Sequence, residues 1–131
     1  MSRKPKMSKE STCFETMKKL WSLKEKGKLC DAFILVGGER VNCHRNVLAV
    51  SSDYFDKSFE YSKNPVFSTL NIDSNALDNR FSPIAVEAIL HSIYLGSLPE
   101  DLDVGLLPEI LVIADMWMLE ALEEECVNLP C

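Results

Sequence analysis

The chain has 131 residues, 47% of them hydrophobic and 26% charged, which fits one globular domain with a sizeable core. No apolar run approaches the length of a membrane-spanning helix, and the Lys-rich start lacks the apolar region of a secretory signal. The net charge of −6 is unevenly spread, because residues 1–28 carry nine basic and three acidic side chains, a charge of +6, which leaves −12 for the remainder. The acidic body argues against a nucleic-acid-binding domain.

The N-terminal region predicts a tail followed by a helix. Residues 1–11 are polar and rich in Lys and Ser, which is typical of a disordered basic tail, although the short basic run at residues 3–6 also allows a nuclear localisation signal or a nucleic-acid contact. Thr12 and Glu15 stand in capping-box spacing and Gly27 can end a helix, so we expect a helix over residues 12–27. Its large apolar side chains fall on one stripe, Phe14, Met17, Leu20 and Trp21.

A β-hairpin is the strongest local prediction. The apolar run Ala32–Val36 is followed by Gly37 and Gly38, which supply the positive φ that a two-residue turn needs. The returning segment, residues 39–43, alternates polar and apolar residues, so Val41 and Cys43 are expected to face the core.

The rest of the chain predicts mostly helices. Short helices are expected over residues 45–50 and 53–61, and alternation over residues 66–72 predicts a third strand. Ser82 followed by Pro83 is a strong helix start for residues 84–95, which end before Gly96. Two more helices are expected over 108–116 and 119–127. The chain contains no internal repeat or linker, so we predict one α+β domain over residues 12–128, with a three-stranded sheet flanked by helices.

The sequence offers no pattern for catalysis, a cofactor or a metal. Cys43 and His44 are neighbours at a strand end and point to opposite faces, so they cannot form a dyad. Glu87 and His91 lie one helical turn apart, but no further ligands with suitable spacing accompany them. Five cysteines, without a CxxC pair or a secretory signal, predict free thiols in a reducing compartment, the cytoplasm or the nucleus. We therefore expect neither an enzyme nor a membrane or nucleic-acid binder.

Several motifs, in order along the chain, resemble the BTB/POZ domain family. The family's "LCD", "AHR–VLA", "S–YF" and "YTG" patterns are matched by residues 29–31, 43–49, 52–55 and 93–96, and residues 113–126 resemble its C-terminal helices. The resemblance covers nearly all of residues 12–128. It implies a protein-interaction domain, usually a homodimer, in which the N-terminal helix packs onto the partner subunit.

On this resemblance, we expect the dimer interface to contain five residues, Phe14, Met17, Leu20, Trp21 and Leu29. An apolar stripe with two aromatic side chains must be covered by something, and packing back onto its own domain is the alternative. In some zinc-finger members of the family, a charged pocket lies at the dimer groove. The matching residues here are Asp31, His44 and Arg45, although Asp31 and Arg45 could equally serve to orient the hairpin and the following helix.

The resemblance leaves two functions open. Kelch-linked members are substrate adaptors that recruit a cullin scaffold to build a ubiquitin ligase, and there Tyr54 and Phe59 would lie on the helix that faces the cullin. Cullin binding in that branch commonly uses a hydrophobic-x-Glu motif, whereas residues 60–65 read EYSKNP. Zinc-finger members are transcription regulators whose dimer groove recruits corepressors, and they have a similarly short segment here.

Overall fold

The computed structural model describes residues 9–60, 68–71 and 81–128. These ranges contain six α-helices and three strands, and the predicted α+β class is confirmed. The hairpin strands are β1 (Ala32–Val36) and β2 (Glu39–Cys43), paired antiparallel with Ile34 opposite Val41. Strand β3 (Ser68–Asn71) pairs with β1 in parallel, so that the sheet order is β2-β1-β3.

The predicted hairpin turn is confirmed. Gly37 and Gly38 both have positive φ, 56° and 78°, so the two-residue turn needs the conformational freedom that only glycine has without strain. Val41 and Cys43 are buried on the core side of the sheet, as the alternating pattern predicted. The same alternation turns every second side chain of the two strands, Phe33 and Arg40 among them, to the other face, where the Arg40 guanidinium lies over the Phe33 ring at 4.0 Å.

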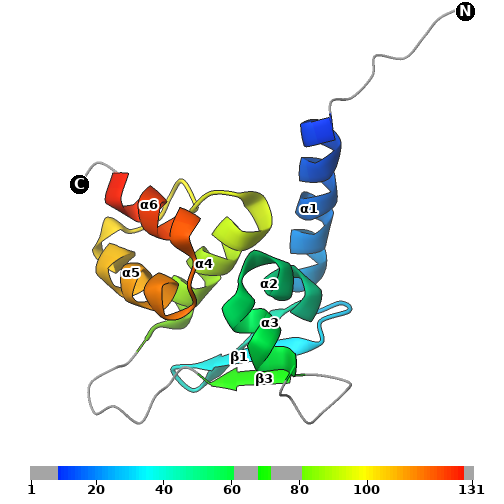
Figure 1. Ribbon diagram of the computed structural model, residues 1–131, viewed down its shortest axis with the longest axis horizontal. Helices are drawn as coiled ribbons and strands as arrows, with labels where there is room; N and C mark the ends of the chain where they lie inside the picture. The colour runs from blue at the N-terminus through cyan, green and yellow to red at the C-terminus, as the bar shows by residue number, and fades with distance from the viewer. Residues whose placement is uncertain (1–8, 61–67, 72–80, 129–131) are drawn as a thin grey trace, which may run out of the picture.

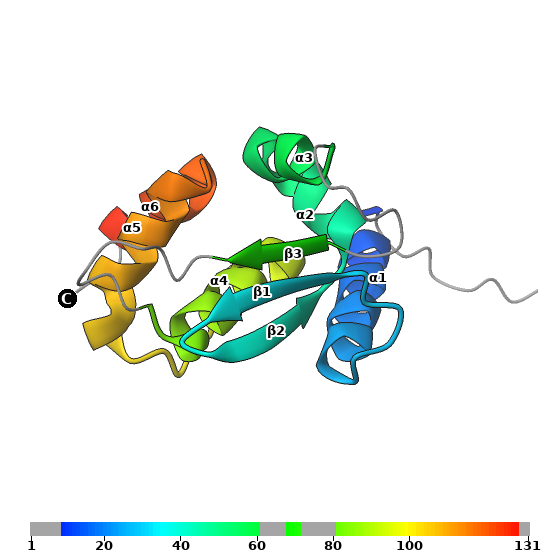
Figure 2. The ribbon, with the colours of Figure 1, turned by 90° about the horizontal axis from the view of Figure 1, so that it is seen from below.

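Helix α4 (Pro83–Leu95) packs behind the sheet, with α5 (Leu107–Met116) and α6 (Glu120–Asn128) to one side of it and α1 (Lys9–Glu25), α2 (Arg45–Ser51) and α3 (Asp53–Glu60) to the other (Figure 2). It contacts β2, α1, α2 and α5. The Ser82 side chain caps α4 by accepting a hydrogen bond from Ala85 N–H, and Gly96 ends it with φ 89°. Both helix boundaries were predicted from these residue types, and the largely apolar sequence between them explains why α4 is buried.

Helices α2 and α3 cover one end of the sheet, and α5 and α6 pack together at the other (Figures 1 and 2). A short 3-10 turn, η1 (Val104–Leu106), leads into α5. Tyr94, Phe55 and Trp117 are the largest of the fully buried side chains. None of the helices in the described ranges combines the length and the hydrophobicity that a bilayer span requires.

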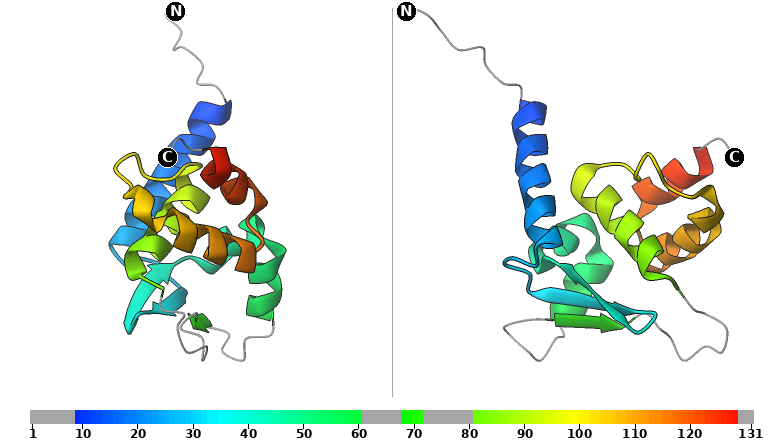
Figure 3. Two further views of the ribbon diagram at one scale, coloured as in Figure 1. Left: turned by 90° about the vertical axis from the view of Figure 1, so that its left-hand side faces the viewer. Right: turned by 180° about the vertical axis from the view of Figure 1, so that it is seen from behind.

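The predicted start of the first helix is wrong by three residues. Helix α1 begins at Lys9, so Thr12 lies inside it, and its carbonyl oxygen accepts a hydrogen bond from the Thr16 hydroxyl. Glu10 in the first turn suits the positive end of the helix dipole, which favours the longer helix over a cap at Thr12. Residues 9–11 of the predicted tail are therefore helical, whereas residues 1–8 lie outside the described residues. The first turns of α1 project away from the body (Figure 3).

Candidate functional site

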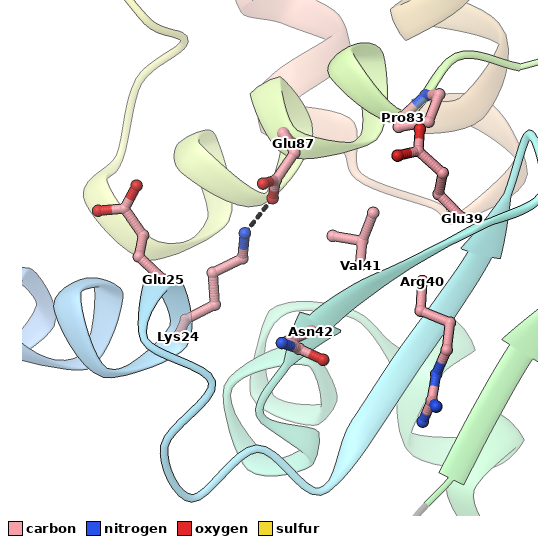
Figure 4. A pocket seen from close by; sticks show the side chains of 8 residues that line it. All are labelled: Lys24, Glu25, Glu39, Arg40, Val41, Asn42, Pro83 and Glu87. Carbon is pink, nitrogen blue, oxygen red and sulfur yellow. Dashed lines mark hydrogen bonds and ion pairs between the residues drawn. The ribbon is translucent and has the colours of Figure 1, made fainter.

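The C-terminal half of α1 is fastened to the body of its own chain. Trp21 packs edge-on against His91 and Tyr94 of α4, with ring centroids 5.4 Å apart in each case. Lys24 is 4% exposed, forms an ion pair with Glu87 of α4 and lies over the Trp21 ring at 4.8 Å. Figure 4 shows this ion pair bridging the two helices beside a polar hollow that β2 completes. Sequence reasoning missed Lys24 because its partner lies 63 residues away.

The stripe predicted for a dimer interface is divided by this packing. Met17, Leu20 and Trp21 pack partly buried against the core of their own chain, which was the alternative considered for them. Phe14 and Leu29 are exposed, at 48% and 82%. The division follows from geometry: Phe14 lies on the projecting part of α1, and Leu29 sits in the link to β1 with a left-handed φ of 59° that turns the chain. The uncovered apolar surface of the predicted interface is therefore centred on these two residues.

His44 does not belong to an exposed charged pocket, because it is buried and bonded to the body. Its backbone N–H donates to the Tyr94 hydroxyl at 2.9 Å, and its Nδ1 lies 2.7 Å from the same oxygen. Its Nε2 lies 3.0 Å from the Lys28 carbonyl oxygen. A neutral imidazole that donates from Nε2 and accepts at Nδ1 from the hydroxyl satisfies all three contacts. His44 thus holds the link after α1 against α4, whereas Asp31 and Arg45 are the members of the predicted pocket that remain partly exposed.

Asp31 and Arg45 do lie together, at the start of α2. Asp31 Oδ1 accepts a hydrogen bond from the Arg45 backbone N–H at 2.7 Å, and Oδ2 accepts one from Arg45 Nε at 3.4 Å. The side chain of His44, the residue before α2, does not cap the helix. The carboxylate of Asp31, which is distant in sequence, instead accepts a hydrogen bond from a backbone N–H at the start of α2. The pair therefore orients the hairpin against α2, and both side chains also remain partly exposed.

A shallow hollow of about 350 Å³ joins this pair to helix α3. Its lining residues are Asp31, Arg45, Asn46, Ala49 and Phe59. Phe59 stacks on the buried Phe55, with centroids 6.2 Å apart, and is itself only partly buried. Tyr54 packs edge-on against Phe55 from the same helix and is also half-buried. Two sets of residues that the sequence placed in separate sites, the charged pair and Phe59, thus share one surface.

The thiols whose pKa values shift are held in their neutral form. Burial raises the pKa of Cys43 far above its ordinary value, and burial also raises the pKa of Cys30 against an opposing effect of Lys24. Burial and two neighbouring glutamates raise the pKa of Cys126. A nucleophilic cysteine needs the opposite shift. The residues that the structure describes also contain no group of three His, Cys, Asp or Glu side chains that could hold a metal ion.

Comparisons with known proteins agree with the fold. The BTB/POZ domain family model matches residues 20–131. Human zinc finger and BTB domain-containing protein 21 is 36% identical over 73 residues, which are 56% of this chain and 6% of that protein. Kelch repeat and BTB domain-containing protein 1 of camelpox virus (strain CMS) is 30% identical over 103 residues, 78% of this chain and 17% of that protein. The chain therefore spans only a small part of the length of these relatives.

Two solved structures share the whole fold. The BTB domain of zebrafish PATZ1 aligns over 97% of this chain and 96% of its own, with a TM-score of 0.71 and 24% identity. The BTB domain of human gigaxonin aligns over 98% of both chains, with a TM-score of 0.72 and 22% identity. The family match, the shared architecture and the ordered motifs lead to one conclusion: the chain belongs to the BTB/POZ domain family and is a non-catalytic protein-interaction module.

Proposed function

We propose that this domain forms a homodimer and acts as the substrate-adaptor module of a cullin-type ubiquitin ligase. BTB domains typically form homodimers. The observation that supports a dimer here is the apolar surface left uncovered on the projecting part of α1 and the following link, at Phe14 and Leu29. A second copy would bury these side chains, and the charged face of α1 would stay in water.

Exposed residues allow a sharper test of the dimer than buried ones. Trp21 packs within its own chain, so replacing it would disturb folding as well as assembly. Phe14→Glu changes a side chain that is 48% exposed and should convert the dimer to a folded monomer in light scattering and analytical ultracentrifugation. Val112→Glu, at a position of similar exposure on α5, is the matched control and should stay dimeric. A dimer that persists in Phe14→Glu would place the interface elsewhere.

The adaptor proposal is supported by the relatives that carry kelch repeats, which match 78% of this chain. We expect the partly exposed faces of Tyr54 and Phe59 on α3 to contact the cullin. A purified cullin N-terminal region should bind the domain in a pull-down, and Phe59→Ala should weaken this binding while Val127→Ala on α6 does not. Failure of the unaltered domain to bind any cullin would remove the adaptor proposal and leave the dimer untouched.

Corepressor recruitment by a transcription regulator is the second candidate. It is favoured by the hollow where Asp31, Arg45 and Phe59 meet, because a charged pair beside a partly exposed aromatic side chain suits a short peptide. Arg45→Gln removes the guanidinium but leaves the backbone bond that Asp31 accepts, so it should reduce binding of a corepressor peptide in isothermal titration without unfolding α2. Nuclear location of the full protein would accompany this function, whereas the adaptor function suits the cytoplasm or the nucleus.

A further inference from the structure

We propose that a second groove, between α1, α4 and residues 99–106, binds a basic amphipathic peptide segment of a partner protein. The groove encloses about 340 Å³ and lies apart from the Asp31–Arg45 hollow. Apolar side chains line it from three elements, with Trp21 from α1, Ala88 from α4 and Leu102 from the following segment. Ile84, at the first turn of α4, borders it and is 63% exposed. These residues would accept an apolar side chain of the peptide.

Carboxylates surround this apolar lining. Four of the lining residues are acidic, Glu25, Glu87, Asp101 and Asp103. Asp103 caps the following turn through Gly105 N–H, and Glu87 is paired with Lys24. Among the residues that the structure describes, the side-chain carboxylates of Glu25 and Asp101 make neither a hydrogen bond nor an ion pair, and the imidazole of His91 is bonded to the Ser97 carbonyl. The groove therefore presents negative charge that its own side chains leave uncompensated, which favours a cationic ligand.

Lys24 shows how two lining residues of the groove, Trp21 and Glu87, bind an ammonium group. Its Nζ is paired with Glu87 and lies 4.8 Å from the centre of the Trp21 ring, so one carboxylate and one aromatic face stabilise the buried charge together. Figure 4 shows Glu25 to one side of this ion pair, and Val41 and Glu39 of the hairpin to the other. A Lys or Arg of the partner would lie beside Glu25 and Asp101, and a neighbouring apolar residue would cover Ile84. An acidic peptide would be repelled by the same carboxylates.

The test uses three short fluorescein-labelled peptides of equal length and fluorescence anisotropy at physiological salt. One peptide is built from Lys and Leu, one from Lys and Ser, and one from Glu and Leu. The Lys–Leu peptide should bind saturably and the other two much more weakly. Its Kd should rise by about tenfold in the double variant Glu25→Gln with Asp101→Asn, and by a similar factor in Ile84→Ser, because each removes one half of the recognition.

The matched control is the double variant Glu120→Gln with Glu124→Gln, which removes the same charge from the exposed face of α6. It should change the Kd by less than about twofold. In two-dimensional NMR spectra, the peptide should shift the indole N–H of Trp21 and the amides of residues 100–106. Equal weakening by the control, equal binding of the Lys–Ser or the Glu–Leu peptide, or shifts confined to other elements would each overturn the proposal. Because all variants lie on the surface, matching urea transitions verify that they are folded.

Discussion

We expect the two partners of the Lys24–Glu87 ion pair to differ in how much stability the protein loses when each is replaced. Glu87→Gln leaves a buried ammonium without its counter-charge, whereas Lys24→Met replaces that ammonium by an apolar side chain of similar length that can pack on Trp21. Removing one member of a fully buried pair costs about 3–5 kcal/mol. Glu87 is 47% exposed and glutamine keeps an acceptor, so we expect Glu87→Gln to cost about 1–2 kcal/mol. Lys24→Met should cost less than about 1 kcal/mol.

Urea denaturation at one fixed protein concentration measures both changes. With an m-value of about 2 kcal/mol/M, Glu87→Gln should lower the midpoint by about 0.5–1 M. The double variant should lose about as much stability as Lys24→Met alone, because it leaves no buried charge without a partner. The cost of the double variant, compared with the sum of the two single costs, gives the coupling energy of the pair. A Lys24→Met variant that loses as much stability as Glu87→Gln would refute the reasoning. It would mean that the lysine contributes mainly through its charge over the Trp21 ring, which methionine lacks.

Three further predictions concern stability. Asp31→Ala should cost about 1–2 kcal/mol in urea denaturation, because the Arg45 N–H loses a charged acceptor, and a cost below about 0.3 kcal/mol would contradict the cap. Tyr94→Phe should cost about 1–3 kcal/mol, because two polar atoms of His44 lose their shared partner, whereas an unchanged midpoint would show that water replaces the hydroxyl. Burial raises the pKa of the Cys43 thiol and of the Tyr94 hydroxyl, so their contribution to stability should be fully present below about pH 8 and should fall as the unfolded chain ionises at higher pH. Cys43→Ala should reduce the slope of stability against pH between about pH 8.5 and 10, and an unchanged slope would remove that thiol as the cause.

Local signals predicted much of the fold. Gly37–Gly38 specified the hairpin turn, and Ser82 with Gly96 bounded α4, because each of these residue types satisfies a backbone requirement within a few positions of itself. The start of α1 was missed although its signal was also local. Thr12 and Glu15 have the spacing of a cap, but nothing before Thr12 prevents another turn of helix, and Glu10 supports one.

Long-range pairing limited the prediction of the site. The sequence placed Asp31 beside Arg45 only through the resemblance, and it gave no sign that Phe59 would join them. Trp21 was expected to face a partner subunit, yet a complementary surface exists within the chain at His91 and Tyr94. A stripe on a helix reveals that it must be covered, and its spacing contains no information on which surface covers it.

The two oxygens of Asp31 have different consequences for how this domain could diversify. Oδ1 holds a backbone N–H, which every residue but proline possesses, whereas Oδ2 holds the side chain of Arg45. Substitutions at position 45 can therefore alter the exposed chemistry of the hollow while the start of α2 keeps its anchor. A substitution at position 31 changes folding and recognition at once. Position 45 can therefore change partner preference without loss of the fold, whereas position 31 cannot.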